Sequence, residues 1–258
     1  MAKLVKYFFL WPPRTEKEIL VLDRWYREIH GPEYMAYWGP WMSRYVTYRA
    51  LPAPPEAARY GYWNHRITEQ FFFTEGHWAE AMQTMGMPTP PPRIEKMFIP
   101  EPSTPRAAVA LFPARPTEDF VGNLLTVSEK TYIRWYIIFR YPDGVPVEEG
   151  EKWYLETHSK EVMQQPGLIR YFSHRAVAAP SPHPGVEMPR PWVRLSEQWY
   201  EDFDGWRKSV IEAPIKYTAP PWAKMKEPPF MEPSVDFAST FVGETPDIDF
   251  FRDVRPRP

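Results

Sequence analysis

The sequence contains an internal repeat, and this repeat constrains the fold more than any other feature. Arg24–His30 (RWYREIH) matches Lys152–His158 (KWYLETH) at its Trp, Tyr, Glu and His positions. So many matches in one order predict two copies of a single structural unit in tandem. The further matches are Glu33 with Glu161, Met35 with Met163, Gly39 with Gly167, Arg44–Ala50 with Arg170–Ala176 after a two-residue gap, Glu69–Gln70 with Glu197–Gln198, and Trp78 with Trp206.

Each copy predicts the element order β-α-β-β-α-β. Thr15 can cap a helix from Glu16 through Ile29, and Gly31-Pro32 is expected to break or kink it just after His30. Apolar and aromatic patterning predicts the other elements. They are Leu4–Trp11, Arg44–Leu51, Ile67–Phe73, Glu75–Met85 and Arg93–Ile99 in the first copy, and Thr131–Arg140, Val147–Met163, Ile169–Val177, Val193–Tyr200, Phe203–Ile211 and Val235–Phe241 in the second.

This element order is that of a ferredoxin-like unit, in which helices cover one face of an antiparallel sheet. The bare face of each sheet must be buried, and two such sheets in one chain can pack face to face. We therefore predict an α+β fold in which residues 1–115 and 116–258 form two ferredoxin-like repeats that close into an intramolecular dimeric α+β barrel. The space between the sheets is the expected pocket. The chain is expected to be a monomer with a full barrel or a homodimer.

The composition limits the classes of partner. A formal net charge of −2 and an isoelectric point near 6.3 favour neither nucleic acid nor a membrane surface. The chain has no cysteine, which excludes disulfides, thiolate catalysis and cysteine-based metal sites. No apolar stretch approaches the ~20 residues of a membrane helix. Lys6 interrupts the apolar run Met1–Trp11, which we interpret as a strand rather than a signal peptide, so a cytoplasmic protein is expected.

Aromatic residues are unusually frequent. They make up 17% of the chain, with 12 Trp among them. Aromatic side chains supply large, rigid apolar area, so they can build the core or line a pocket for an aromatic ligand. Both interpretations can hold at once.

The first copy resembles the EthD-like family of the dimeric α+β barrel superfamily. The pattern is a strand, then a helix that ends in Trp25-Tyr26-x-x-x-His30-Gly31-Pro32, then a strand that contains Arg44-Tyr45-Val46-x-x-Arg49. The resemblance covers both halves of the chain. The second copy departs from it, because Ser159-Lys160 follow His158 in place of Gly-Pro.

The resemblance implies a ferredoxin-like fold and an activity that needs neither a metal nor an organic cofactor. Relatives in this superfamily include cofactor-free cyclases, isomerases, decarboxylases, dehydratases and quinone-forming monooxygenases, often acting on aromatic or polyketide substrates. An aromatic small molecule is therefore the expected ligand. Fold does not fix function, so the choice among these activities stays open.

His30 and His158 are the first candidates for chemistry. Each follows a tyrosine, Tyr26 or Tyr154, by four residues, so that tyrosine and histidine share a helix face. A histidine in an apolar cleft can transfer a proton near neutral pH. The structural alternative is a histidine that binds the last carbonyls of its helix. The family pattern favours function for His30, and both interpretations are open for His158.

The second strand of each copy carries the next candidates. The copies agree at two arginines and differ at Tyr48 and His174, which suggests a pocket with a single catalytic end. Each arginine is expected to form a structural ion pair or to bind a substrate carboxylate or phenolate. Glu69 and Glu197 are expected to pair with these arginines or to act as an acid or base. The arginines are Arg44, Arg49, Arg170 and Arg175.

Three functions remain open. The first is a cofactor-independent lyase or isomerase that decarboxylates or dehydrates a bulky aromatic acid or phenol, with His30, His158, His174 and Tyr48 as proton-transfer groups. The second is a cofactor-free monooxygenase, and the third is a non-catalytic binding protein. The sequence has no metal motif, Gly-rich phosphate loop or nucleophile elbow, which argues against kinases, α/β-hydrolases and NAD enzymes.

Overall fold

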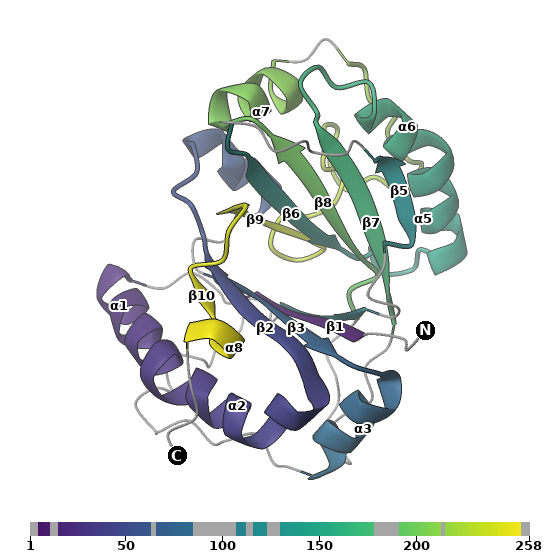
Figure 1. Ribbon diagram of the computed structural model, residues 1–258. Helices are drawn as coiled ribbons and strands as arrows, with labels where there is room; N and C mark the ends of the chain where they lie inside the picture. Colours follow the sequence, from purple (N-terminus) through teal and green to yellow (C-terminus); the bar gives the residue numbers. More distant parts are fainter. Residues whose placement is uncertain are drawn as a thin grey trace.

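The computed structural model describes residues 5–10, 15–62, 66–84, 107–111, 116–122, 130–177, 191–212 and 215–253. The predicted strand Arg93–Ile99 lies outside these residues. The described part of the chain forms two units, one above the other in Figure 1. None of the described helices is both long enough and apolar enough to cross a membrane.

The first unit begins with a capped helix, as the sequence predicts. The Thr15 hydroxyl accepts the N–H of Glu18 at 3.4 Å, and the Glu18 carboxylate accepts the N–H of Thr15 at 3.3 Å. The described elements of this unit are β1 (Val5–Leu10), α1 (Glu16–Trp25), the π-helical turn η1 (Tyr26–His30), α2 (Gly31–Trp38), η2 (Gly39–Trp41), β2 (Met42–Arg49), η3 (Pro55–Tyr60), β3 (Arg66–Phe72), α3 (Glu75–Thr84) and β4 (Ala107–Leu111).

The second unit repeats this order. A short strand precedes it, and a short strand and helix follow it. Its described elements are β6 (Ile133–Phe139), α5 (Val147–Trp153), the π-helical turn η4 (Tyr154–His158), α6 (Ser159–Val162), β7 (Arg170–Val177), β8 (Arg194–Tyr200), α7 (Phe203–Val210) and β9 (Phe237–Gly243). The strand before it is β5 (Glu118–Val121), and the strand and helix after it are β10 (Ile248–Asp249) and α8 (Phe250–Asp253).

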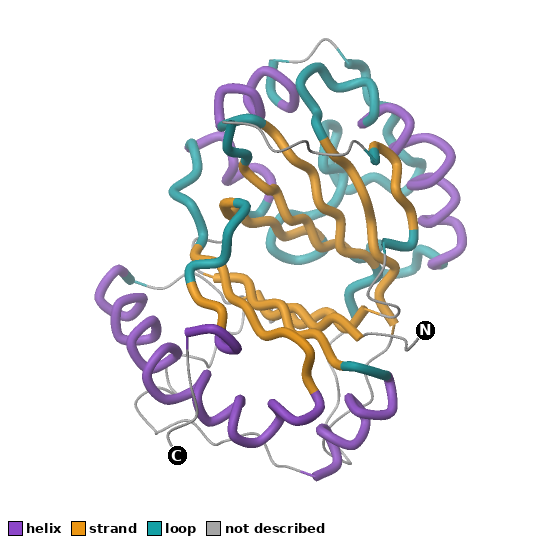
Figure 2. Tube along the Cα trace, viewed as in Figure 1, coloured by secondary structure: helices purple, strands orange, loops and turns teal. Residues whose placement is uncertain are grey.

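The strands of both units follow the ferredoxin-like order. They run β2-β3-β1-β4 and β7-β8-β6-β9, antiparallel throughout, and β4 pairs with β7 to join them. At the other edge the N–H of Ser239 donates to the carbonyl of Gly61 at 3.0 Å, and the N–H of Leu51 donates to the carbonyl of Phe241 at 2.8 Å. Figure 2 shows the two layers of strands facing each other with the helices outside. The predicted α+β fold of two ferredoxin-like units is confirmed.

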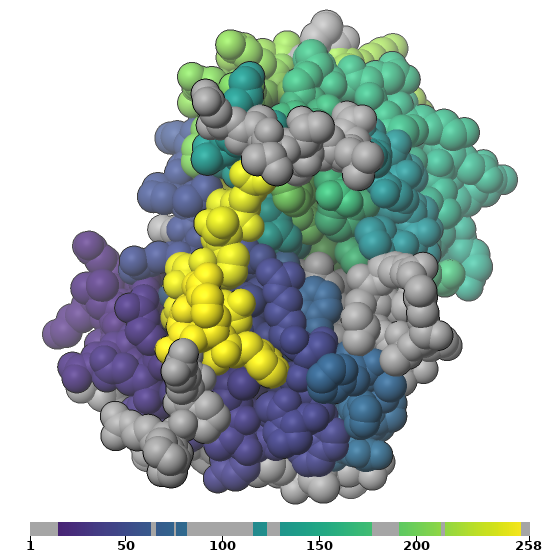
Figure 3. All heavy atoms as spheres, in the orientation of Figure 1, coloured from purple at the N-terminus to yellow at the C-terminus, as the bar shows by residue number. Residues whose placement is uncertain are grey.

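The two units also exchange short segments. β5, which follows the last strand of the first unit, pairs with β7 of the second, and β10, which follows the second unit, pairs with β2 of the first. The C-terminal helix α8 continues from β10, and Figure 3 shows this yellow segment lying across the first unit. The sequence did not predict this exchange, because β5 and β10 are only four and two residues long.

The helix is not broken at Gly31-Pro32, so of the predicted break or kink the break is wrong. The N–H of Gly31 donates to the carbonyl of Tyr26, which defines a π turn, and α2 continues from it. Pro32 lies in the first turn of α2, a position where proline is tolerated. In the second unit the N–H of Ser159 donates to the carbonyl of Tyr154 in the same way. The Tyr-x-x-x-His pattern therefore marks a repeated π turn, a feature often found at functional sites.

Candidate functional site

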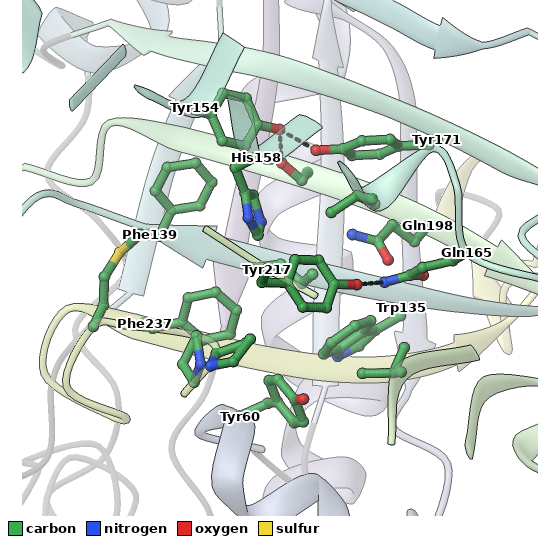
Figure 4. A pocket seen from close by; sticks show the side chains of 17 residues that line it. Tyr60, Trp135, Phe139, Tyr154, His158, Gln165, Tyr171, Gln198, Tyr217 and Phe237 are labelled. Atoms are coloured by element: carbon green, nitrogen blue, oxygen red, sulfur yellow. Dashed lines mark hydrogen bonds between the residues drawn. The ribbon is translucent and has the colours of Figure 1, made fainter. Parts of the chain in front are cut away.

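A cavity lies between the second sheet and its helices (Figure 4). Its volume is about 40 Å³, room for about three water molecules. Its lining residues come from all four core strands of the unit, from η4, α6, α7 and η3, and from loops after α6 and α7. They are Tyr60, Trp135, Ile137, Phe139, Tyr154, His158, Val162, Gln165, Tyr171, Ser196, Gln198, Val210, Tyr217, Pro228, Pro229, Met231 and Phe237.

The sequence predicted the pocket between the two sheets, and the structure places this cavity elsewhere. Between the sheets, Val46 and Tyr48 of the first unit pack with Tyr136 and Ile138 of the second. Large apolar side chains therefore occupy the space that the prediction left open. The cavity lies on the other face of the second sheet, toward which Trp135 and its alternate neighbours on β6 point.

His158 ends the π turn η4 and lines the cavity. The indole of Trp153 stacks on its imidazole, with the ring centroids 4.8 Å apart and the planes 23° from parallel. Its Nδ1 is buried and has no hydrogen-bond partner among the described residues. Burial lowers the pKa of His158 to about 4. The imidazole is therefore neutral at pH 7, and it can accept a proton at one nitrogen and donate one from the other.

Hydroxyl groups form the polar part of the cavity wall. The Tyr154 hydroxyl lies 2.8 Å from the Tyr171 hydroxyl and 2.8 Å from the Ser196 hydroxyl (Figure 4). Burial raises the pKa of both tyrosines, so both keep their protons at neutral pH. On another wall, the Gln165 amide donates to the Tyr217 hydroxyl at 2.5 Å.

No charged side chain is found among the described residues that line the cavity. The walls are aromatic and aliphatic, with neutral hydroxyl, amide and imidazole groups. An ionised ligand would lose its hydration without gaining a partner of opposite charge. The cavity therefore suits an uncharged ligand with an apolar body and one or two polar atoms.

His30 occupies the equivalent position in the first unit but does not line this cavity. Only 6% of its surface is exposed, and its ring centroid lies 4.4 Å from that of Trp25 and 4.3 Å from that of Tyr34. Burial lowers its pKa to about 3. Tyr26, predicted to share a face with His30, has its ring centroid 5.1 Å away. Of the two predicted histidine-tyrosine pairs, the structure brings His158 and Tyr154 to the cavity.

Several predicted site residues meet between the sheets instead. Arg134 donates to Glu197 at 2.6 Å and to Glu69 at 3.1 Å, and its guanidinium lies 4.9 Å from the Tyr48 ring centroid. The two glutamates thus share an arginine that the sequence analysis did not single out. His174 pairs across the strands with Leu195 of the inter-sheet cluster, so it belongs to the same face, and 2% of it is exposed.

The four predicted arginines lie apart from the cavity. Arg49 pairs with Asp23 at 2.9 Å and is half-exposed. Arg175 lies 3.9 Å from Glu151, at the limit of an ion pair. Neither partner is Glu69 or Glu197, which corrects the predicted pairing. Arg44 packs over Phe71, and Arg170 packs over Phe172 and Trp199.

Two arginines that the analysis missed hold the units together. Arg66 donates to Asp23 at 2.8 Å and to Asp247 at 2.8 Å, and Asp247 belongs to the segment exchanged from the second unit. Arg194 pairs with Glu151 at 2.6 Å and with Glu118 of β5. The repeat could have revealed them, because both stand three residues before the paired Glu-Gln.

The structure describes no group of three or more His, Cys, Asp or Glu side chains that could hold a metal ion. This statement covers only the described residues. Two of the cavity residues that sequence reasoning missed, Gln165 and Tyr217, come from loops without a periodic pattern, so no sequence signal pointed to them. Others lie on predicted strands, and Trp135, Ser196 and Phe237 are among them.

Comparison with known proteins supports the fold. The family model for the chalcone isomerase N-terminal domain matches residues 3–93, which lie within the first unit and are about a third of the chain. An anthrone oxidase-like protein of known structure has a TM-score of 0.54 at 9% identity, with 94% of this chain and 91% of that chain covered. Chlorite dismutase from Candidatus Nitrospira defluvii has a TM-score of 0.46 at 9% identity, with 95% and 92% covered. No curated protein sequence matches.

At 9% identity, the likeness to the anthrone oxidase-like structure supports the α+β fold alone. The matching family model is not the EthD-like one, so the finer resemblance stays a prediction.

Proposed function

We propose that the protein binds a small, uncharged aromatic ketone or phenol in the cavity and that His158 transfers a proton to or from it. One observation carries this proposal. A neutral imidazole with a buried, unpartnered Nδ1 stands in the wall of an aromatic cavity that has no charged lining residue among those described. A general base has to be unprotonated and within hydrogen-bond reach of the proton that it takes from its substrate.

The reaction supported best is an isomerisation by proton transfer. His158 takes a proton from the carbon beside a carbonyl, the C–H electron pair moves into the enolate, and the oxygen gains the negative charge. The imidazolium then returns the proton to another carbon or to oxygen, so that atoms and charge balance. Neutral hydroxyl donors beside the oxygen stabilise the charge that develops there.

The names of the two similar proteins agree with this ligand class. Chalcone and anthrone are both uncharged aromatic ketones. The sequence predicted a bulky aromatic acid or phenol, with the four arginines either in structural ion pairs or on a substrate carboxylate or phenolate. Because none of Arg44, Arg49, Arg170 and Arg175 lines the cavity, the structure supports a ketone or phenol over an acid.

The cavity volume limits the size of a ligand that binds without rearrangement. A volume of about 40 Å³ is well below the roughly 150 Å³ that admits benzene in an engineered cavity. An aromatic ligand therefore needs wall residues to move. Tyr217, Pro228 and Pro229 lie on loops at one side of the cavity, whereas the opposite wall is made of sheet residues. We expect ligand entry to displace the loop side.

A second candidate function is oxygenation without a cofactor. An enolate or phenolate can itself give electrons to O2, so the same first proton transfer by His158 would begin this reaction. The likeness to an anthrone oxidase-like protein favours keeping this candidate. The third candidate function is that of a protein that binds the ligand and does not convert it.

The test is hydrogen–deuterium exchange in D2O. Purified protein is incubated with acetophenone and anthrone, with and without O2, and products are read by mass spectrometry and NMR. We expect deuterium to enter the methyl group of acetophenone and the C10 methylene of anthrone, and His158→Gln to slow this exchange by about 100-fold or more. His30→Gln is the matched control. Loss of exchange only in His30→Gln would move the active histidine to the first unit. If the wild type binds these ligands without deuterium exchange, the protein is a non-catalytic binding protein.

A further inference from the structure

One of the side chains that line the cavity has a hydroxyl group without a partner. Four others with a hydroxyl already hydrogen-bond within the wall: Tyr154 lies 2.8 Å from both Tyr171 and Ser196, and Tyr217 accepts an amide N–H. The Tyr60 hydroxyl makes no hydrogen bond within the part of the chain that the structure describes. Only 4% of Tyr60 is exposed, and buried polar groups normally have a partner. A ligand in the cavity can supply it.

Packing explains the ring of Tyr60 and not its hydroxyl. The ring stands at 88° to that of Trp135, with the centroids 5.2 Å apart, and at 79° to that of Trp206, with the centroids 6.2 Å apart. A phenylalanine ring would make the same contacts. Burial raises the pKa of Tyr60 to about 12, so the hydroxyl keeps its proton at neutral pH and can both donate and accept a hydrogen bond.

Tyr60 belongs to the first unit, although the cavity lies in the second. It ends η3, and its carbonyl accepts the Ser239 hydroxyl of β9 at 2.8 Å. The neighbouring Arg59 donates to the carbonyl of Pro228 at 2.9 Å, and Pro228 lines the cavity. The first unit therefore supplies one side chain of the wall and is bound to a loop that supplies another. Both contacts fix the position of the Tyr60 ring.

Tyr60 and His158 lie at different ends of the cavity. Figure 4 shows them on opposite sides of the Tyr217 ring in that view. A benzene ring with two para substituents carries them on opposite sides of the ring. A ligand with its carbonyl group at His158 can thus direct a para substituent toward Tyr60. A few placed polar groups of this kind fix the orientation of a ligand in an apolar pocket.

We propose that the Tyr60 hydroxyl binds a second oxygen atom of the ligand, at the end of the aromatic ring away from His158. The preferred ligand is then an aromatic ketone with a hydroxyl or ether oxygen in the para position. This inference rests on the proposed function of the same cavity and deepens it. It gives the first unit a ligand-binding role, while proton transfer stays with His158 in the second.

The test compares two probes of similar size, para-hydroxyacetophenone and para-methylacetophenone, which differ in a hydroxyl and a methyl group. Binding to the full-length protein is measured by equilibrium dialysis at pH 6, where the phenol is neutral. Tyr60→Phe should weaken binding of the hydroxyl probe by about fivefold or more and leave the methyl probe within about twofold, because only the former loses a hydrogen bond.

Tyr62→Phe is the matched control. It removes a hydroxyl from the same segment of the first unit, but Tyr62 donates to the Leu51 carbonyl and does not line the cavity. We expect it to leave the affinity ratio of the two probes unchanged. The same loss of the hydroxyl probe in both variants would overturn the inference, and so would an equal loss of both probes in Tyr60→Phe, which would make Tyr60 a packing residue.

A measurement on the wild type keeps the inference testable if Tyr60→Phe does not fold. Meta-hydroxyacetophenone places its oxygen away from the para position and should bind about threefold or more weakly than para-hydroxyacetophenone. Equal affinities would contradict the subsite. If the wild type exchanges deuterium into the acetyl group of para-methylacetophenone while the affinity ratios stay flat, the proposed function stands and this inference alone fails. If no probe binds, both fail.

Discussion

Val162 stands in the second unit where Tyr34 stands in the first, and this pair explains why the cavity is found beside His158. The Tyr34 ring packs against His30 with ring centroids 4.3 Å apart, and 2% of Tyr34 is exposed. Val162 lines the cavity instead. A valine lacks the volume to fill the space that a tyrosine fills, so the smaller residue leaves room beside the second histidine.

Val162→Tyr should therefore close the cavity. We expect it to abolish acetophenone binding, while the circular dichroism spectrum and cooperative unfolding are kept. The matched change is Tyr34→Val, which leaves a space beside His30 and should destabilise the first unit by about 2–5 kcal/mol. Binding is measured by equilibrium dialysis and stability by urea unfolding. Wild-type binding by a folded Val162→Tyr protein would show that the ligand site is elsewhere.

Gly31 depends on having no side chain, because Phe250 of the exchanged C-terminal helix packs against it. A Cβ at Gly31 would lie 1.9 Å from Cε1 of Phe250. Gly31→Ala should lower the free energy of unfolding by about 1–3 kcal/mol through overpacking. Gly39→Ala is the control, because its Cβ would meet only Met35, at 3.4 Å, and should be neutral or slightly stabilising. Equal stability of the two variants in urea would contradict the tight contact.

The fold was predictable because the repeat and the apolar patterns extend over whole elements. Trp25 and its counterpart in the second unit, Trp153, occupy equivalent positions, with 6% and 8% of their surfaces exposed. The exchanged segments were not predictable, since Ile248–Asp249 pairs over only two residues. Periodicity needs more residues than that, so tertiary contacts decide where such a segment lies.

The candidate site was predictable only in part. The sequence pattern pointed to His158 and Tyr154, because the repeat places Tyr and His four residues apart. It did not show which face of the second sheet has the cavity, because β6 is buried on both faces. The decisive difference, Tyr34 to Val162, is a single substitution whose effect depends on packing partners far away in the sequence.

Arg134 neutralises the charge of two buried glutamates between the sheets, so we expect its replacement to be strongly destabilising. Arg134→Met would leave Glu69 and Glu197 without their shared cation, both with 2% or less of their side chains exposed. We expect a loss of about 3–5 kcal/mol in the free energy of unfolding. Adding Glu69→Gln and Glu197→Gln should recover most of it, because the uncompensated charges are removed. If the triple variant is no more stable than Arg134→Met in urea, lost packing rather than charge is the cause.

The two buried histidines predict a loss of stability in acid. Their native pKa values, about 3 for His30 and about 4 for His158, lie below the unfolded value of about 6.5. Between these values the unfolded chain binds protons that the native protein does not, so the stabilising contribution is complete above pH 6.5 and is lost as pH falls toward 4 and then 3. From pH 7.5 to 4.5 the loss should be of order 2 kcal/mol for each histidine.

This pH dependence is measured by urea unfolding of the wild type, His30→Gln and His158→Gln at both pH values. Glutamine does not titrate. Each variant should therefore lose less stability on acidification than the wild type does, and the difference should equal the contribution of the histidine that was replaced. His30 is the more deeply buried of the two, and its replacement should flatten the profile at least as much as that of His158. Because carboxylates titrate equally in all three proteins, they cancel in the comparison. Identical pH profiles for all three proteins would mean that both imidazoles titrate in the folded chain near pH 6.5, as in the unfolded chain, and would contradict the lowered pKa of His158.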